Sequence, residues 1–148
     1  MIAIYRIVSP STTSDFDEYY KLRWELLRKQ WNQPIGSEKD ELESQSIHYS
    51  VRSNDDDLIG VCRMHFPSDE TAQIRFMAVK SACQGLGIGS SLLQKAENDA
   101  RLNGIKKILL QSRETAVYFY QKQGYEIIEK TFLLYGTIQH FLMQKQLF

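Results

Sequence analysis

Residues 84–93, QGLGIGSSLL, hold three of the chain's eight glycines within five positions. The apolar residues that follow recur at the spacing of one helix face, which predicts a helix over residues 87–103. The first amides of a helix have no partner within it, and they lie at the positive end of the helix dipole. Glycines leave these amides uncovered, so an anion can approach them closely. The segment therefore predicts a binding site for a phosphate group at the start of this helix.

Two other glycine motifs do not fit this segment. A dinucleotide-binding motif has the spacing GxGxxG after a strand, with an acidic residue at the end of the next strand. Here the spacing is GxGxG, and the next predicted strand ends in Gln111 and Ser112. The GxxxxGK[ST] pattern of a P-loop does not occur in the sequence. A turn that merely tolerates glycine needs one such residue rather than three, so we favour the phosphate-binding helix start.

Strand and helix patterns alternate along the whole sequence, with no linker that would divide it. Residues 3–9 alternate apolar and polar side chains and predict a strand, while residues 15–31 repeat apolar residues at helical spacing. We expect Ser14 to cap this helix and Ser112 to cap a short helix near residue 118. Pro34 and Gly36 end the first of these helices, and a short second helix could begin after them. The other predicted strands are three within residues 46–79, followed by 105–112, 125–134 and 139–148.

The length fits a single domain over residues 1–148, and the order of the predicted elements places it in the α+β class. Lys and Arg total 18 and balance 18 Asp and Glu, so the basic excess typical of nucleic-acid-binding proteins is missing. No apolar run is long enough to span a membrane, and the first residues do not resemble a signal peptide. Cys62 and Cys83 are isolated, and the three histidines lack metal-ligand spacing. We therefore expect a cytoplasmic protein with no metal, nucleic-acid or membrane partner.

Three segments of the sequence resemble the GCN5-related N-acetyltransferase (GNAT) superfamily. Residues 84–89, QGLGIG, are similar to its Q/R-x-x-G-x-G/A signature, and residues 72–79, AQIRFMAV, precede it at the right distance. Residues 116–126, AVYFYQKQGYE, resemble its A-x-x-FY-x-K-x-G-F/Y segment, and GTIQHFLMQK resembles the tail of a bacterial subgroup. The resemblance spans nearly the whole chain. It implies a six- to seven-stranded, mostly antiparallel sheet that splays at its centre and is flanked by about four helices.

The resemblance also implies acetyl-CoA as the cosubstrate of a direct, ternary-complex transfer of acetyl to an amine. The pyrophosphate of the cofactor would bind the amides before the helix, and its pantetheine arm would pair with the splayed strand. The acceptor amine would belong to a small molecule or a protein. The residues implied for the cofactor are Met77, Ala78, Val79, Gln84, Gly85, Leu86, Gly87, Ile88, Gly89 and Ser90.

The catalytic residues follow from the same resemblance. Tyr120 occupies the general-acid position, although its aromatic neighbours also fit a core role. Many relatives carry a glutamate as base where this sequence has Gln73, an amide that cannot take up a proton at neutral pH. Glu114, His65 or a chain of waters would replace it as the base. Glu114 could instead only stabilise the start of its helix, and His65 could be an ordinary strand histidine.

The first helix and the loop after it would form one wall of the acceptor site. Arg23, Arg28 and Trp31 are the candidate contacts, and packing or solvated roles are equally open for them. A possible homodimer would use the apolar C-terminal segment, residues 140–148. Two alternatives to an enzyme are a non-catalytic acetyl-CoA-binding sensor, suggested by the missing glutamate, and a nucleotide-binding module that shares only the phosphate loop.

Overall fold

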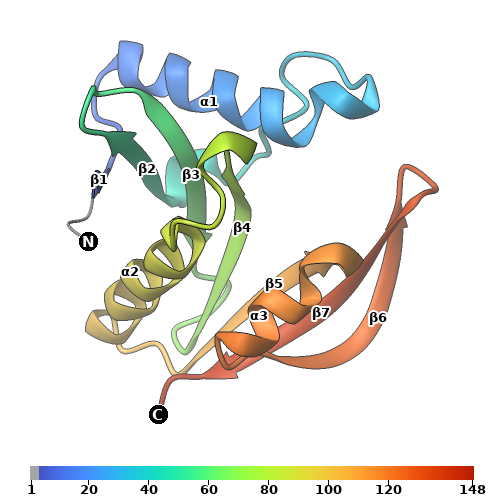
Figure 1. Ribbon diagram of the computed structural model, residues 1–148. Helices are drawn as coiled ribbons and strands as arrows, with labels where there is room; N and C mark the ends of the chain where they lie inside the picture. Colours follow the sequence, from blue (N-terminus) through green and yellow to red (C-terminus); the bar gives the residue numbers. More distant parts are fainter. Residues whose placement is uncertain (1–3) are drawn as a thin grey trace. The chain divides into compact units, whose positions relative to one another are not determined.

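The computed structural model describes residues 4–148, which form two compact units (Figure 1). Unit 1 contains residues 4–65 and 76–94, and unit 2 contains residues 66–75 and 95–148. Strand β4 (Thr71–Val79) and helix α2 (Ile88–Leu102) each contribute residues to both units. Of the predicted strand 3–9, residues Tyr5–Val8 form β1. Ala3 lies outside the described residues.

The order of elements predicted from the sequence is confirmed. Seven strands and three α-helices lie within residues 4–148, which places the chain in the α+β class. The strand order in the sheet is β1-β2-β3-β4-β5-β7-β6. About four helices were expected, but the segment after Pro34, where a short second helix was predicted, forms only the 3₁₀ turn Glu43–Gln45. The remaining elements are β1 (Tyr5–Val8), α1 (Thr13–Leu27), β2 (Ile47–Ser53), β3 (Leu58–His65), β5 (Lys107–Arg113), α3 (Val117–Lys122), β6 (Glu126–Leu134) and β7 (Ile138–Gln146).

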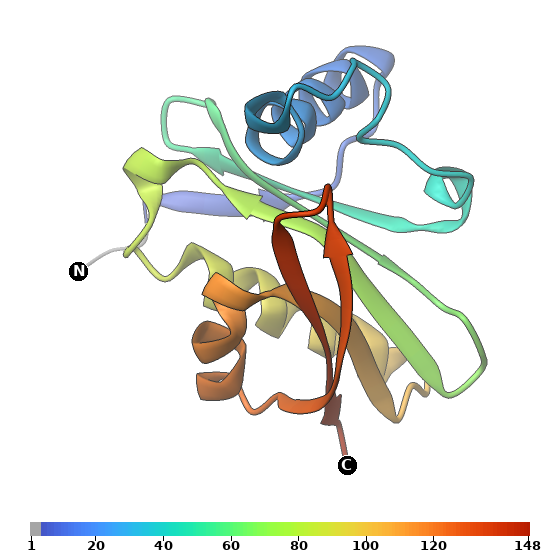
Figure 2. The ribbon, with the colours of Figure 1, turned by 90° about the vertical axis from the view of Figure 1, so that its right-hand side faces the viewer.

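In unit 1, α1 covers one face of the strands and the first half of α2 covers the other (Figure 2). Strand β2 is antiparallel to both β1 and β3. The buried side of α1 supplies Tyr19 and Leu22, which pack against Leu58 and Val61 of β3. This packing fixes α1 and therefore the loop that follows it. Partly buried residues around this core are Phe16, Tyr20, Leu26 and Ala78.

Both ends of α1 differ from the prediction. Its cap is Thr12 rather than Ser14, because the Thr12 hydroxyl accepts a hydrogen bond from the Asp15 amide at 3.0 Å, and Asp15 completes a capping box. The helix ends at Leu27 instead of continuing to Trp31, which lies in the 3₁₀ turn Lys29–Trp31. Asn32 follows in the left-handed conformation, with φ 57°, and so ends the turn.

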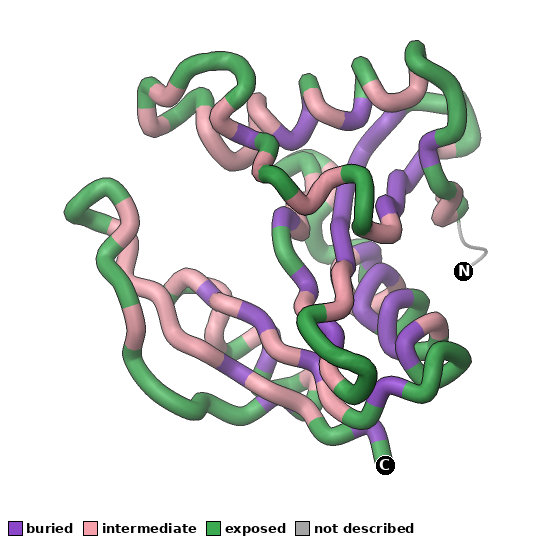
Figure 3. Tube along the Cα trace, turned by 180° about the vertical axis from the view of Figure 1, so that it is seen from behind, coloured by how far each residue is buried: buried purple, intermediate pink, exposed green. Residues whose placement is uncertain are grey.

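In unit 2, β5 runs parallel to the first part of β4 and antiparallel to β7, which pairs with β6. Ser112 is the last but one residue of β5 and caps no helix, since its hydroxyl donates to the Arg113 carbonyl. A 3₁₀ turn, Glu114–Ala116, precedes α3 instead. Buried side chains from α3, β5 and β7 meet in the core, whereas β6 is exposed along almost its whole length (Figure 3). The buried set includes Ile108, Leu110, Tyr120, Tyr125 and Met143.

Candidate active site

The glycine-rich segment forms an exposed loop between a 3₁₀ turn, Ser81–Cys83, and α2. The first helical hydrogen bond joins the Ser91 amide to the Gly87 carbonyl at 3.0 Å. The amides of Ile88 and Gly89 therefore have no carbonyl partner within the helix. Gly85 and Gly87 have φ angles of 85° and 80°, and a Cβ atom on either would meet no other atom within 4 Å. The loop thus combines a backbone that favours glycine with open space in front of it.

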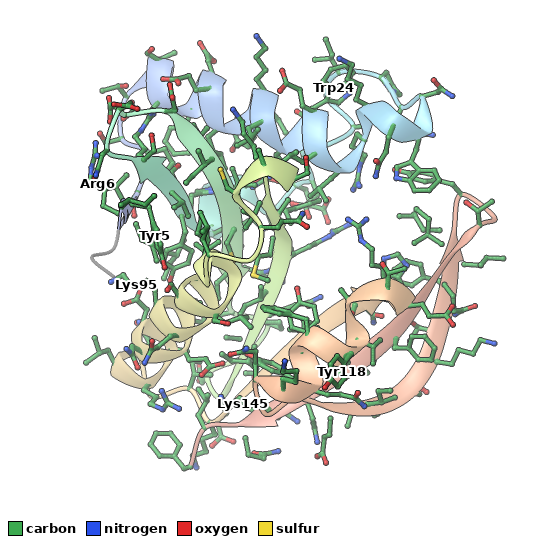
Figure 4. All side chains as sticks on the ribbon, in the orientation of Figure 1. Tyr5, Arg6, Trp24, Lys95, Tyr118 and Lys145 are labelled. Carbon is green, nitrogen blue, oxygen red and sulfur yellow. The ribbon has the colours of Figure 1, made fainter. Side chains whose placement is uncertain are left out.

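A hydroxyl pair holds the start of α2 in unit 1. The hydroxyls of Tyr5 and Ser91 lie 2.7 Å apart, and Tyr5 also donates to the Gly87 carbonyl at 3.5 Å. Figure 4 shows Tyr5 on β1 beside the beginning of α2. Sequence reasoning missed this contact, because 86 positions separate the two residues and no local pattern joins them. The contact fixes the junction between the exposed loop and α2.

Strand β4 has an irregular backbone at Phe76. Its register with β5 pairs residues 71–74 with 107–110, and the next residue but one, Phe76, has a left-handed φ of 57°. The three residues expected to bind the cofactor, Met77, Ala78 and Val79, follow it and are half-buried. The Gln84 side chain donates to the Val79 carbonyl at 3.2 Å, which connects this strand end to the glycine loop. Both predicted cofactor segments therefore belong to unit 1.

Tyr120 and Glu114, two of the catalytic candidates, belong to unit 2. Tyr120 is buried in α3, and its ring makes edge contacts with Phe119 at 5.1 Å and with Tyr125 at 5.9 Å between centroids. Glu114 is exposed at the beginning of the 3₁₀ turn before α3. The ring of Tyr120 is therefore packed like that of a core residue. This packing is compatible with both the structural role and the general-acid role of its hydroxyl.

The third candidate, His65, is half-buried at the end of β3 in unit 1. Its Nδ1 lies 3.4 Å from Nη2 of Arg63. Gln73, which takes the position of the glutamate in many relatives, is half-buried on β4 and stands opposite Leu109 in the register with β5. Neither His65 nor Glu114 is thereby singled out as the base.

The three acceptor-site candidates all lie in unit 1, but their surroundings differ. Arg23 is fully buried, donates to the Tyr19 hydroxyl at 2.9 Å and to the Glu38 carbonyl at 3.0 Å, and pairs with Glu43. Arg28 is half-buried and donates from Nε to the Ser37 carbonyl at 3.1 Å. Trp31 is half-buried. Arg28 and Trp31 retain surface that a ligand can touch, whereas the contacts of Arg23 are internal.

The buried titratable groups near α1 serve the interior of unit 1. His48 contacts the Tyr19 hydroxyl through Nδ1 at 3.0 Å and the Glu43 carbonyl through Nε2 at 2.8 Å. Burial lowers the pKa of His48 and raises that of Tyr19. Cys62 is fully buried, which raises the pKa of its thiol to about 12 and leaves it as a small buried hydrophobe.

The structure bears on the expectations of no metal site and no membrane-spanning helix for residues 4–148 only. Within this range, no group of three or more His, Cys, Asp or Glu side chains is arranged to hold a metal ion. No helix formed by these residues is long and apolar enough to cross a membrane.

The chain combines an α+β fold with an exposed glycine loop of the kind that holds a phosphate group. Solved structures have the same fold. An aminoglycoside 6'-N-acetyltransferase complexed with coenzyme A has a TM-score of 0.78 at 16% identity, covering 99% of this chain and 98% of that one. A GNAT family acetyltransferase from Elizabethkingia anophelis with acetyl-CoA bound has a TM-score of 0.73 at 18% identity, covering 96% and 97%.

The sequence comparisons identify the family. The acetyltransferase (GNAT) family model matches residues 11–125, so the chain belongs to this family. The uncharacterised N-acetyltransferase YjcF of Bacillus subtilis is 29% identical over 129 residues, which are 87% of this chain and 90% of YjcF. The aminoalkylphosphonate N-acetyltransferase of Salmonella typhimurium is 27% identical over 126 residues, covering 78% of this chain and 82% of that enzyme. Family membership assigns the chain to the acetyl-CoA-dependent N-acetyltransferases, with acetyl-CoA as cosubstrate.

Proposed function

We propose that this chain transfers the acetyl group of acetyl-CoA directly to the primary amine of a small molecule, within a ternary complex. The observation that carries the proposal is the exposed glycine loop before α2. The amides of Ile88 and Gly89 have no carbonyl partner within the helix, and open space lies in front of Gly85 and Gly87. A diphosphate at these amides would anchor the cofactor, and its pantetheine arm would run along Met77, Ala78 and Val79.

The transfer itself needs few protein groups. The neutral amine attacks the thioester carbonyl, so that a C–N bond forms and the C–S bond breaks. The amide of Val79 or Ala78 would stabilise the oxyanion, and the Tyr120 hydroxyl would give its proton to the departing thiolate. The proton lost by the amine would pass to Glu114, to His65 or to water.

The acceptor is proposed to be a small amine bound beside the loop after α1. One relative in this family acts, by its name, on aminoalkylphosphonates, which combine a primary amine with an anionic group. Arg28 and Trp31 are half-buried in the segment that would line the acceptor site, and a guanidinium would suit an anion on the acceptor. These two side chains are therefore our candidates for recognising the acceptor.

Two further expectations remain part of the proposal. A cytoplasmic location is supported by two cysteines that are both free thiols. The C-terminal segment 140–148 was expected to join a partner copy, but its strand β7 already pairs with β5 on one side and β6 on the other. We therefore propose β6 as the homodimer edge instead, since it ends the strand order and exposes Ile127, Phe132 and Leu133. Sedimentation velocity of the purified chain would measure its mass, and a monomer at all concentrations would contradict the dimer.

Binding and turnover can be tested separately with the purified chain. Titration calorimetry with CoA, ATP and NAD should give binding by CoA alone, because only CoA has a pantetheine arm for β4. A thiol-release assay with acetyl-CoA should then detect turnover with at least one amine from a panel that includes aminoalkylphosphonates, aminoglycosides, polyamines and peptides. CoA binding without turnover on every amine would favour the sensor, and equal binding of ATP would favour a general nucleotide module.

The role of Tyr120 has its own test. Tyr120→Phe keeps the buried ring but removes the hydroxyl, so kcat should fall by about 10² while the affinity for CoA stays the same. Tyr118→Phe is the matched control, since Tyr118 lies on the same helix with 70% of its surface exposed. A Tyr120→Phe enzyme as active as the Tyr118→Phe enzyme would remove Tyr120 from the mechanism.

A further inference from the structure

Phe76 has a backbone conformation that aromatic residues rarely adopt. It lies within β4, yet its φ of 57° is in the left-handed region. A side chain with a Cβ is disfavoured there, and a bulky one most of all. Such a residue persists only where its surroundings hold it, and strain of this kind collects at functional sites. The side chain of Phe76 is only 8% exposed, so its surroundings are the interior of unit 1.

Three arginines surround the Phe76 ring. The guanidinium carbons of Arg23, Arg63 and Arg28 lie 4.3, 4.9 and 5.6 Å from the ring centroid. All three distances are within the range of cation–π attraction. They come from α1, from β3 and from the residue after α1, so three parts of unit 1 converge on one side chain of β4.

Two of these arginines have no solvent-exposed surface. Arg23 and Arg63 are both 0% exposed, and burial of two charges is unfavourable unless they are paired. Glu43 supplies both pairings, with Oε1 3.0 Å from Arg23 Nη1 and Oε2 2.9 Å from Arg63 Nη1. Asp40 adds a second carboxylate 2.6 Å from Arg63 Nη1. The network fixes both guanidinium groups beside the ring.

The hydrogen bonds of this cluster are incomplete. Among the buried groups that the structure describes, Nε of Arg23, Nε of Arg63 and Oε1 of Glu43 have no hydrogen-bond partner, although Oε1 lies 3.0 Å from Arg23 Nη1 as an ion pair. A network that served stability alone would gain from satisfying them, since an unpaired buried polar group is unfavourable. The two arginine side chains instead keep their planar groups close to Phe76. The contact with the ring is therefore what this arrangement favours.

We propose that Arg23 and Arg63 are positioning residues that act through Phe76 on the cofactor. They hold the left-handed backbone of Phe76, and thereby set the direction of the amides and carbonyls of Met77, Ala78 and Val79, which follow it in β4. This inference rests on the proposed function, in which those groups receive the pantetheine arm and the thioester. It also replaces direct acceptor binding as the role of Arg23, whose side chain is fully buried with internal partners.

The two halves of CoA provide the test. Arg23→Met and Phe76→Leu each place an unbranched or branched apolar side chain at the buried position. Each removes one partner of the contact between the guanidinium groups and the Phe76 ring. Each should weaken CoA binding by about 10-fold and lower kcat by up to about 100-fold, because a small displacement of β4 misplaces the thioester. Binding of 3'-phosphoadenosine 5'-diphosphate, which has the diphosphate but no pantetheine arm, should not change. Phe76→Leu keeps the test valid if Arg23→Met fails to fold.

Lys39→Met is the matched control. Lys39 also stacks on a ring in unit 1, with Nζ 4.3 Å from the Tyr20 centroid, but it does not contact Phe76. This variant should bind both probes like the wild type. An additional measurement uses Phe76→Gly, which accepts a left-handed φ without strain. Adding Arg23→Met to Phe76→Gly should reduce CoA binding less than Arg23→Met does alone.

The outcomes distinguish this inference from the function beneath it. A wild-type protein that binds neither CoA nor the nucleotide probe would overturn the proposed function. A wild-type protein that binds CoA, with Arg23→Met and Phe76→Leu variants equal to it, would overturn the positioning role alone. Variants that lose CoA and the nucleotide probe in equal proportion would also overturn it, since that is the result of a purely structural role.

Discussion

Helices α1 and α2 each have 15 residues, yet they begin in opposite ways. At α1 the chain completes its own helix start: Asp15 accepts from the amides of Ser11 and Thr12 at 3.1 and 3.3 Å. These two hydrogen bonds hold the pKa of Asp15 below its usual value. The first turn of α2, residues 88–91, has no acidic residue, and glycines precede it.

The difference separates a structural helix start from a binding one. Backbone amides at a helix start favour a negative group, and at α1 the amides of Ser11 and Thr12 bond the Asp15 carboxylate. Where the sequence supplies the carboxylate, the helix is stabilised. Where the sequence supplies glycine and no acid, the amides stay available for a ligand's phosphate. Four predictions test this contrast.

The largest effect is expected from Gly87→Val. A branched side chain would fill the open space in front of the amides, and the loss of two or more charge-assisted hydrogen bonds should weaken CoA binding at least about 100-fold. Calorimetry measures this affinity. Gly104→Val is the control, because Gly104 has a similar φ of 75° and equally open space, but follows α2 instead of preceding it. Equal CoA affinity in both variants would remove the loop from the binding site.

A charge at position 86 should have an intermediate effect. Leu86 is 46% exposed in the loop, so Leu86→Asp should weaken CoA binding and Leu86→Lys should strengthen it, each by about 2- to 5-fold at low salt. Added salt should reduce both changes. Leu102→Lys makes the same charge change at the last residue of α2, where Leu102 is 86% exposed, and should leave the affinity unchanged. The same response to both lysines would reveal only a general charge effect.

Removing the cap of α1 should affect stability and not binding. Thr12→Ala deletes the hydroxyl that accepts from Asp15, and should lower the free energy of unfolding by about 1 kcal/mol. Urea unfolding measures it, and CoA affinity should stay at the wild-type value. Ser14→Ala, a change two residues further along, should have little effect. If Ser14→Ala were the more damaging change, Ser14 would be the cap after all.

The smallest effect is a dependence on pH. Because the pKa of Asp15 is lower in the folded chain than in the unfolded one, its stabilising effect is complete above about pH 3.9 and is lost as the pH falls through the folded value. Asp15→Asn should therefore lower the melting temperature at pH 7 but not in strong acid. A difference that stays constant across this range would show that the charge of Asp15 contributes nothing.

Much of the fold follows from patterns within short stretches of sequence. The alternation of strands and helices, the position of α2 and the glycine loop were predicted correctly, because apolar spacing and glycine act over a few residues. The ends of elements were predicted less well. Both Thr12 and Ser14 can cap a helix by residue type, and only the conformation around Asp15 decides between them.

The sequence by itself therefore determined the order of elements, the family and the exposed backbone before α2. The tertiary structure decided which residues surround that backbone. Tyr5 reaches Ser91, and Arg23 and Arg63 reach Phe76, across separations that no local pattern records. The physical reason is that periodicity reports which side of its own element a residue faces, whereas the partner on that side depends on how distant elements pack together.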